Sequence, residues 1–168
     1  MNIAAIIKHK YAESSDMTFQ EVYDFAFKSY VPILQNLARD LGEEHFLEAL
    51  RKAARADALR SGQEDASRQA RNDFAAFNAW ATQPSRFWKH VLTFEIVQAT
   101  PQAFEILVTD CLWARTFRDI GAADIGYELV CHPDHAYCQG FNPKISMHRS
   151  KTLMQGQDSC NHCWVWEG

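Results

Sequence analysis

Residues 91–111 decide the fold class, and they read VLTFEIVQATPQAFEILVTDC. Two segments of this stretch, 91–99 and 103–111, are rich in β-branched and aromatic residues, and residues 100–102 between them supply turn chemistry. The stretch therefore predicts a β-hairpin. Because the residues before it follow a helical period, the chain is expected to change from helices to a sheet at this point.

The first helix is predicted to begin at Thr18, with Glu21 three residues later as a capping box. Apolar residues recur at three- and four-residue steps until Gly42, which ends the helix. Pro32 lies inside this segment, so we expect either a kink there or two helices that meet at Val31. The apolar residues that define the period are Phe19, Val22, Ala26, Tyr30, Ile33, Leu37 and Leu41.

Two further helices are predicted in the N-terminal half. One runs from Glu43 to about Arg60, with apolar residues on its inner face and charged residues outside. Ser61 and Glu64 repeat the capping-box spacing, so a third helix is predicted to start there and to end before Pro84.

The residues after the hairpin predict short helices and then a second hairpin. Residues 112–120 and 123–131 have helical patterns, and the second helix must stop near residue 131 because Pro133 disfavours helical geometry at the residue before it. A short turn at 134–139 follows. Two strands, 144–153 and 159–166, are then predicted around a turn.

Together these segments predict an α+β fold in which N-terminal helices pack on a four-stranded antiparallel sheet, with short helices between the two hairpins. The length of 168 residues fits a single domain, with a helical half at 18–88 and a mixed half at 90–166. The formal charge of −4 argues against a nucleic-acid partner, because phosphate contacts need a basic face.

Neither a membrane partner nor secretion is expected. No segment approaches the about 18 apolar residues of a membrane span, and residues 1–10 have their positive charges after the apolar run, the reverse of a secretory signal. We therefore expect a cytoplasmic protein, whose cysteines are thiols rather than disulfides.

The candidate reactive groups are concentrated between residues 110 and 166. This segment holds all five cysteines and four of the seven histidines: Cys111, Cys131, Cys138, Cys160, Cys163, His132, His135, His148 and His162. Apart from this segment, the chain has almost no candidate nucleophile or metal ligand.

Zinc is one possible use of these residues. Cys131, His135, Cys138 and Cys160 have the donor types of a tetrahedral zinc site. However, Cys160 and Cys163 point to opposite faces of a regular strand, and the glycines typical of paired zinc motifs are missing. No cofactor is therefore expected, and a zinc-stabilised domain is kept as an alternative.

Five motifs stand out in the C-terminal half. They are Cys111 with Phe117-Arg118, Cys131-His132-Pro133-Asp134, Gly140-Phe141-Asn142-Pro143, Arg149-Ser150-Lys151-Thr152-Leu153 and Gly156-Gln157-Asp158-Ser159-Cys160. Together they resemble the L-2-amino-thiazoline-4-carboxylic acid hydrolase family, although Gln157 interrupts the usual glycine-acid step. This resemblance implies a small-molecule hydrolase that opens a thiazoline ring to a carbamoyl-cysteine.

The closing pattern of glycine, acid, cysteine and an aromatic strand also resembles small-molecule-binding domains of the 4-vinyl reductase type. That second resemblance implies a pocket that holds an apolar ligand without turnover. A homodimer is compatible with either function, since Trp164 and Trp166 can line a pocket or a dimer contact.

Ring opening needs a nucleophile, a proton donor for the leaving atom and a group that holds the substrate carboxylate. With the hydrolase resemblance, Cys131 or Cys160 is expected as nucleophile and Asp134 as acid and base. His135, like its neighbour His132, can lower a thiol pKa and carry the proton. The competing interpretation is a buried structural cysteine beside a helix-capping aspartate.

Substrate binding is expected from four further residues. Arg118 and Arg149 are the available guanidinium forks for a carboxylate. His162 shares a strand face with Cys160, so the two can line one pocket, and Cys111 completes the group.

Overall fold

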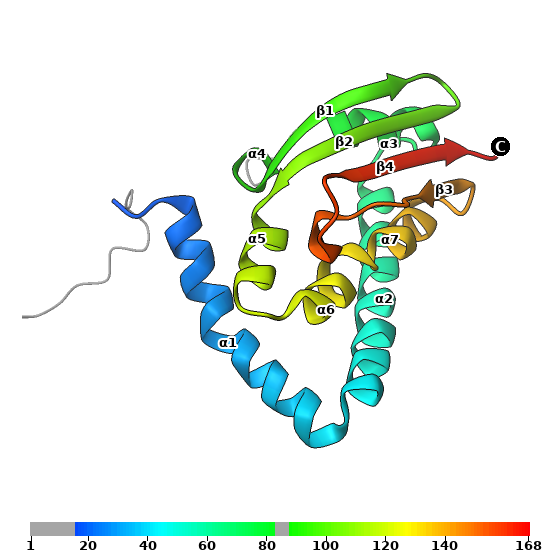
Figure 1. Cartoon of the computed structure of the whole chain (residues 1–168). Helices are drawn as coiled ribbons and strands as arrows, with labels where there is room; N and C mark the ends of the chain where they lie inside the picture. The colour runs from blue at the N-terminus through cyan, green and yellow to red at the C-terminus, as the bar shows by residue number, and fades with distance from the viewer. Residues whose placement is uncertain (1–15, 83–87) are drawn as a thin grey trace, which may run out of the picture.

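The computed structural model describes residues 16–82 and 88–168, and it has the α+β architecture expected from the sequence. Helices α1 (Phe19–Leu41) and α2 (Glu43–Arg68) form a V that meets at Gly42 (Figure 1). The sheet lies across the open end of the V. The expectations for residues 1–10 and for the helix end before Pro84 lie outside the described residues.

Helix α1 runs unbroken through Pro32, so it is not divided at Val31. The predicted capping box is present: the Thr18 hydroxyl accepts a hydrogen bond from the backbone N–H of Glu21, and the Glu21 carboxylate accepts one from Thr18. Gly42 ends the helix with φ +87°, as predicted. The buried residues of α1 are Tyr23, Val31 and Ala38, and none of them belongs to the set whose spacing predicted the helix.

Helix α2 is unbroken at Ser61, so the predicted helix end near Arg60 and the predicted new start are wrong. The reason is close packing on α7 (Asp134–Phe141). A Cβ atom at Gly62 would lie 2.2 Å from the carbonyl oxygen of Tyr137 in α7. The glycine therefore allows two helix backbones to touch, and its neighbour Ser61 is an interior residue rather than a cap.

The third helix, α3 (Phe74–Thr82), begins later than predicted. Its first turn is capped by Asp73, whose Oδ1 accepts a hydrogen bond of 3.0 Å from the N–H of Ala76. The cap was therefore assigned to the wrong residue, Ser61. The short helix α4 (Trp88–Val91) then leads into the sheet.

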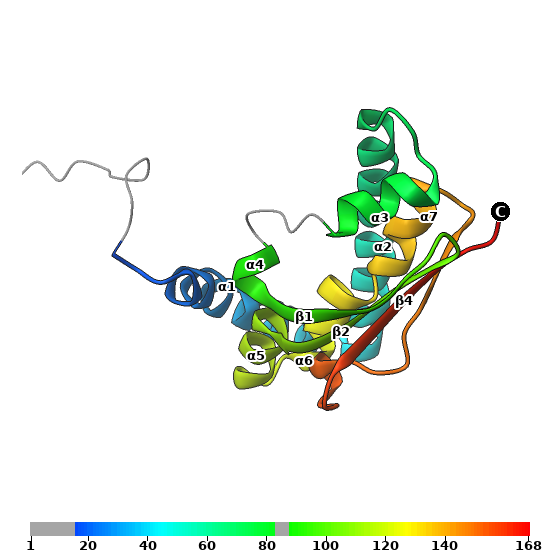
Figure 2. The ribbon, with the colours of Figure 1, turned by 90° about the horizontal axis from the view of Figure 1, so that it is seen from above.

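The sheet is antiparallel throughout, with strand order β1-β2-β4-β3. Strands β1 (Leu92–Ala99) and β2 (Ala103–Cys111) form the predicted hairpin, and β4 (Cys160–Trp166) pairs with β2. In Figure 2, helices α2, α3 and α7 lie together on one side of the sheet. The buried residues of this layer are Phe74, Phe77, Phe104, Ile106, Val108, Cys138, Phe141, Ile145, Met147, Cys160 and Trp164.

The edge strand β3 (Ile145–His148) is shorter than the predicted 144–153. Beyond it the chain leaves the sheet, because the side chain of Asn161 replaces a strand partner. Its Oδ1 accepts hydrogen bonds from the backbone N–H groups of Ser150, at 3.0 Å, and Lys151, at 2.8 Å. This departure lets the Arg149 side chain turn into the protein.

The segment between the hairpins contains α5 (Leu112–Asp119), α6 (Ala123–Gly126), a π-helix at Tyr127–Cys131 and α7. The predicted helix over 123–131 is thus half α and half π, and the predicted turn at 134–139 is a full helix. A 3-10 turn at Leu153–Gln155 precedes β4. In the described part of the chain, no helix is long and apolar enough to cross a membrane.

Candidate functional site

Arg149 is the centre of the polar groups that the sequence motifs supply. Its side chain is only 3% exposed, and Nη1 lies 2.7 Å from Oδ2 of Asp134. Nη2 donates to the carbonyl oxygen of Cys131, and Nη1 lies 3.4 Å from Nε2 of His162. Two separate segments, residues 131–134 and the strand with His162, therefore meet at the guanidinium of Arg149. We call Arg149, Asp134, Cys131 and His162 the Arg149 cluster.

The backbone around Cys131 explains how the cluster is positioned. The N–H of His132 donates to the carbonyl of Tyr127 at 2.8 Å, an i→i−5 bond typical of a π-helix. Cys131 ends this π-helix and Asp134 begins α7, as the sequence predicted. The Cys131 carbonyl would otherwise be an unpaired helix end, and the Arg149 guanidinium satisfies it.

Charge and burial set the protonation of the cluster. Burial lowers the pKa of the Arg149 guanidinium, but the Asp134 carboxylate outweighs this and the net shift is upward. Burial raises the pKa of Asp134, and Arg149 opposes that shift. Burial also lowers the pKa of His162 to about 3 and, less strongly, the pKa of His135. Both imidazoles are therefore neutral near pH 7.

The cysteines near the cluster are buried thiols. The Cys160 sulfur accepts a hydrogen bond from the N–H of Leu153 at 3.1 Å, and the Cys138 sulfur accepts one from Nε1 of Trp164 at 3.2 Å. Burial raises the pKa of Cys131 far above its usual range and that of Cys138 to about 12. These groups are protonated at neutral pH, which makes them weak nucleophiles in the resting protein.

A cavity of about 410 Å³ lies beside the thiols, at the start of α5. Its lining residues are Asp110, Cys111, Ala114, Arg115, Arg118, Asp119 and Leu153, and we call it the Cys111 cavity. Arg118 donates to the carbonyl of Leu153 at 3.3 Å, and Arg115 forms an ion pair with Asp110 at 2.7 Å. The cavity therefore contains a thiol and two guanidinium groups.

The cavity and the cluster are neighbours. Leu153 lines the cavity and donates its N–H to Cys160, and Cys111, Cys131 and Cys160 are close enough to influence one another's pKa values. Burial raises the pKa of Cys111 to about 11.

Six of the eight predicted site residues fall into two groups, and the other two, Cys160 and His135, belong to neither. Asp134, Arg149, Cys131 and His162 meet in the Arg149 cluster, whereas Cys111 and Arg118 line the cavity. Arg149, expected to hold a substrate carboxylate, has both terminal nitrogens engaged inside the protein. The sequence reasoning missed Arg115 and Asp110. Helical spacing could have found the first, because residues 111, 115 and 118 share one face of a helix.

The thiols do not form a metal site in the described residues, where no three His, Cys, Asp or Glu side chains are arranged to hold one ion. Cys160 and Cys163 lie on opposite faces of β4, as predicted: Cys160 is buried under the helices, and Cys163 is part-exposed on the other face. Cys138 and Cys160 are instead each satisfied by a hydrogen-bond donor.

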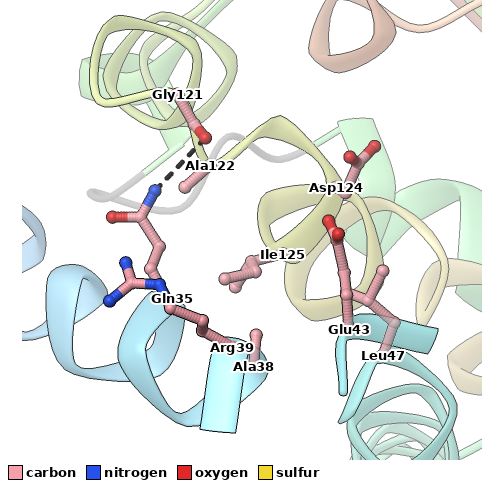
Figure 3. Close-up of a pocket in the computed structure, with 9 residues that line it drawn as sticks. All are labelled: Gln35, Ala38, Arg39, Glu43, Leu47, Gly121, Ala122, Asp124 and Ile125. Carbon is pink, nitrogen blue, oxygen red and sulfur yellow. Dashed lines mark hydrogen bonds between the residues drawn. The ribbon is translucent and has the colours of Figure 1, made fainter. Parts of the chain in front are cut away.

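A second cavity, of about 270 Å³, contains none of the predicted residues (Figure 3). It lies between α1, α2 and the α5–α6 connection, where Gln35 donates to the carbonyl of Gly121 at 3.2 Å. Its charged lining residues, Arg39, Glu43 and Asp124, come from three different segments.

Comparisons with known proteins identify the family and a protein of similar fold. A family model described as L-2-amino-thiazoline-4-carboxylic acid hydrolase matches residues 20–164. No curated protein matches the chain. Among solved structures, the phenol-responsive sensory domain of the transcription activator PoxR with phenol is similar, with a TM-score of 0.54 and 14% identity, over 80% of this chain and 71% of that chain. At this identity the similarity shows a shared fold.

Proposed function

Because the chain belongs to the L-2-amino-thiazoline-4-carboxylic acid hydrolase family, we propose that it hydrolyses a small cyclic carboxylate such as 2-aminothiazoline-4-carboxylate. The observation that carries the proposal is the convergence of two family motifs, 131–134 and 149–153, on the buried Arg149 guanidinium beside a cavity. In the net reaction one water molecule is consumed: the ring carbon between sulfur and nitrogen gains an oxygen, its bond to the ring sulfur breaks, and the leaving sulfur takes a proton.

The substrate binds in the Cys111 cavity, with its carboxylate held by Arg118. Arg118 is exposed at the cavity, and within the described part of the chain its guanidinium donates one hydrogen bond, to the Leu153 carbonyl, unlike the buried Arg149. The ring then faces the thiols. Cys111 is the thiol at the cavity wall, and Cys160 lies behind Leu153.

Asp134 transfers the proton in this proposal. Burial raises the pKa of Asp134 while Arg149 opposes that shift, so this carboxyl is suited to exchange a proton with the leaving atom. His162, with a pKa of about 3, accepts a proton poorly, so His135, whose pKa is lowered less, is the better acceptor. The nucleophile is a thiol from Cys111, Cys131 or Cys160, which adds to the ring carbon while the ring nitrogen of the substrate accepts the thiol proton. The bond from this carbon to the ring sulfur then breaks, and the leaving sulfur takes a proton from Asp134. Water adds to the same carbon in a second step, and the cysteine leaves as a thiol, which releases carbamoyl-cysteine. Arg149 is a positioning residue that fixes the Asp134 carboxylate.

The test is incubation with L-2-aminothiazoline-4-carboxylate and detection of carbamoyl-cysteine by mass spectrometry. Asp134→Asn is expected to lower kcat by about 100-fold or more. Arg118→Gln is expected to raise KM with kcat unchanged. The matched control is Asp57→Asn, which changes an exposed carboxylate of α2. No product from the wild-type protein, or full activity of Asp134→Asn, would overturn the assignment.

A second candidate function is ligand binding without turnover. Two observations favour it: the thiols near the cavity have raised pKa values, and the fold is shared with a sensory domain solved with phenol. This function predicts that a small ligand stays bound in native mass spectrometry while thiazoline substrates remain intact. Single Cys→Ser variants separate the two candidates, because loss of turnover with unchanged binding supports the hydrolase.

A further inference from the structure

Helix α1 exposes an apolar surface on the side that faces away from the protein. The stripe consists of Val22, Phe25, Ala26, Tyr30, Ile33, Leu37 and Leu41, which follow one another at steps of three or four residues except for the adjacent Phe25 and Ala26. Phe25 is 74% exposed, and Ile33 and Leu41 are each 59% exposed. Such spacing places them on one side of an α-helix.

The opposite side of α1 is firmly attached to the protein. Val31 is fully buried there, and the Thr116 hydroxyl donates to the Asp24 carboxylate at 2.8 Å. Gln35 donates to the carbonyls of Ile120 and Gly121 at 3.2 Å. Since these bonds fix the orientation of α1, the apolar stripe cannot rotate inward without breaking them.

The exposed area of the stripe is large. The exposed fractions of its six large side chains correspond to an apolar area on the order of 600 Å², taking about 200 Å² for a large side chain. Monomers rarely expose a larger apolar patch, and one side of a standard protein interface buries about 800 Å². The stripe therefore provides most of the surface that one partner of a stable dimer needs.

We propose that α1 packs antiparallel against α1 of a second copy of this chain, with the two-fold axis near Ser29 and Tyr30. In this register Val22 faces Leu37 of the other copy, and Ala26 faces Ile33. The small side chains of Ala26 and Ser29 allow close approach of the two helices at the centre. The same patch serves both subunits, as two-fold symmetry requires.

Charge selects the antiparallel direction. Glu21 lies near the start of α1 and Arg39 near its end, on the same side of the helix beside the stripe. The proposed register places Glu21 of each copy beside Arg39 of the other. A parallel pair would place Glu21 level with Glu21 of the other copy and would form no contact between Glu21 and Arg39, so it lacks this favourable charge pair.

The first experiment is sedimentation velocity on the full chain. The wild-type protein is expected to be a dimer at micromolar concentration, and Ile33→Glu and Leu37→Glu are each expected to raise the dissociation constant by at least about 100-fold. Val97→Glu is the matched control, because Val97 is 57% exposed in β1 and lies outside the stripe. A monomeric wild type, or a dimer that survives both stripe substitutions, overturns the proposal.

Circular dichroism separates a lost dimer from a lost fold. Both glutamate variants change side chains that are already exposed, so their helical signal is expected to match the wild type. Oxidative cross-linking tests the direction: Ser29→Cys forms a covalent dimer, whereas Val22→Cys does not, because its two copies lie about 22 Å apart in the antiparallel register. Cross-linking of Val22→Cys alone would overturn the antiparallel arrangement; the wild-type chain controls for its own thiols.

Discussion

The Arg149 cluster and the Cys111 cavity contain the same kinds of groups, thiols and guanidinium side chains, but in opposite environments. Arg149 is buried and bound to Asp134 and to a helix end, whereas Arg118 is exposed at a cavity. A buried charge that loses its partner lowers the free energy of unfolding, so the ion pair in the cluster is important for the stability of the fold. An exposed guanidinium remains available for a ligand, so under the proposed function Arg149 positions Asp134 and Arg118 binds the substrate.

The largest expected effect separates the two arginines. Arg149→Ala leaves Asp134 without its ion pair and the Cys131 carbonyl without its donor, and it is expected to lower the free energy of unfolding by about 4 kcal/mol. Arg118→Ala is expected to change it by less than about 0.5 kcal/mol. Urea unfolding measures both.

If Arg149→Ala does not fold, Arg149→Lys provides the comparison. A lysine keeps the positive charge but lacks the planar guanidinium that donates to two partners at once. Equal effects at positions 118 and 149 would contradict the division into a structural and a binding region.

The next effect concerns the position of α7, which begins at Asp134. Gly62→Ala is expected to lower the free energy of unfolding by about 3 kcal/mol, since its Cβ would collide with the Tyr137 carbonyl and push the helices apart. Ser61→Ala, one position earlier in α2, is the control and is expected to be nearly neutral. In contrast, Gly62→Ala is expected to have little effect on the ligand affinity of the Cys111 cavity, which calorimetry measures, because α7 contributes to the Arg149 cluster and not to the cavity lining. A stable Gly62→Ala protein would contradict the close packing.

A smaller effect depends on pH. His162 has a pKa of about 3 in the folded protein and about 6.5 when unfolded, so between these values the unfolded chain binds the extra proton. Its contribution to stability is therefore complete above pH 6.5 and is lost as the pH falls towards 3. Between pH 6.5 and 4.5 the loss is about 2 kcal/mol.

The check is urea unfolding across this pH range for the wild type and His162→Gln. The difference between the two proteins isolates the histidine from other titrating groups, and His148→Gln, which changes an exposed histidine, is the control. Parallel pH profiles for all three proteins would show that His162 is accessible to solvent in the folded state.

The smallest expected effect is on thiol reactivity. Cys111, at the cavity, and Cys163, on the outer sheet face, are expected to react with iodoacetamide about tenfold faster than the buried Cys131 and Cys138, because burial limits both access and thiolate formation. Peptide mass spectrometry after timed alkylation measures the order. Fast modification of Cys131 would instead identify an activated nucleophile inside the cluster.

Much of the fold could be predicted from local pattern. The capping box at Thr18 and the hairpin over 91–111 are each fixed by a few neighbouring residues, and the structure confirms them. A helix also ends at Cys131, but not for the predicted reason, because His132 before Pro133 keeps helical geometry with φ −58° and ψ −39°. The predictions failed where a distant segment decided the outcome. Ser61 resembled a helix cap, yet Gly62 beside it packs against α7 inside a continuous helix. Strand β3 ended earlier than predicted, because the Asn161 side chain binds the backbone N–H groups that follow it.

The candidate site shows the same division. The motifs around Cys131 and Arg149 were found because residue type and spacing carry that information. The engagement of Arg149 by Asp134 could not be foreseen, since it depends on the chain leaving the sheet after His148. Two of the cavity residues, Cys111 and Arg118, were among the predicted substrate-binding residues, whereas Arg115 was not.

By itself, therefore, the sequence determined the fold class, the family motifs and the segment that carries the reactive groups, because hydrophobic period, capping and motif spacing are local properties. Only the tertiary structure decided which face of α1 is buried, which arginine is sealed inside and which thiol meets a cavity. Those outcomes depend on burial and on partners far away in the chain, and burial is what changes the pKa values and pairing of these side chains.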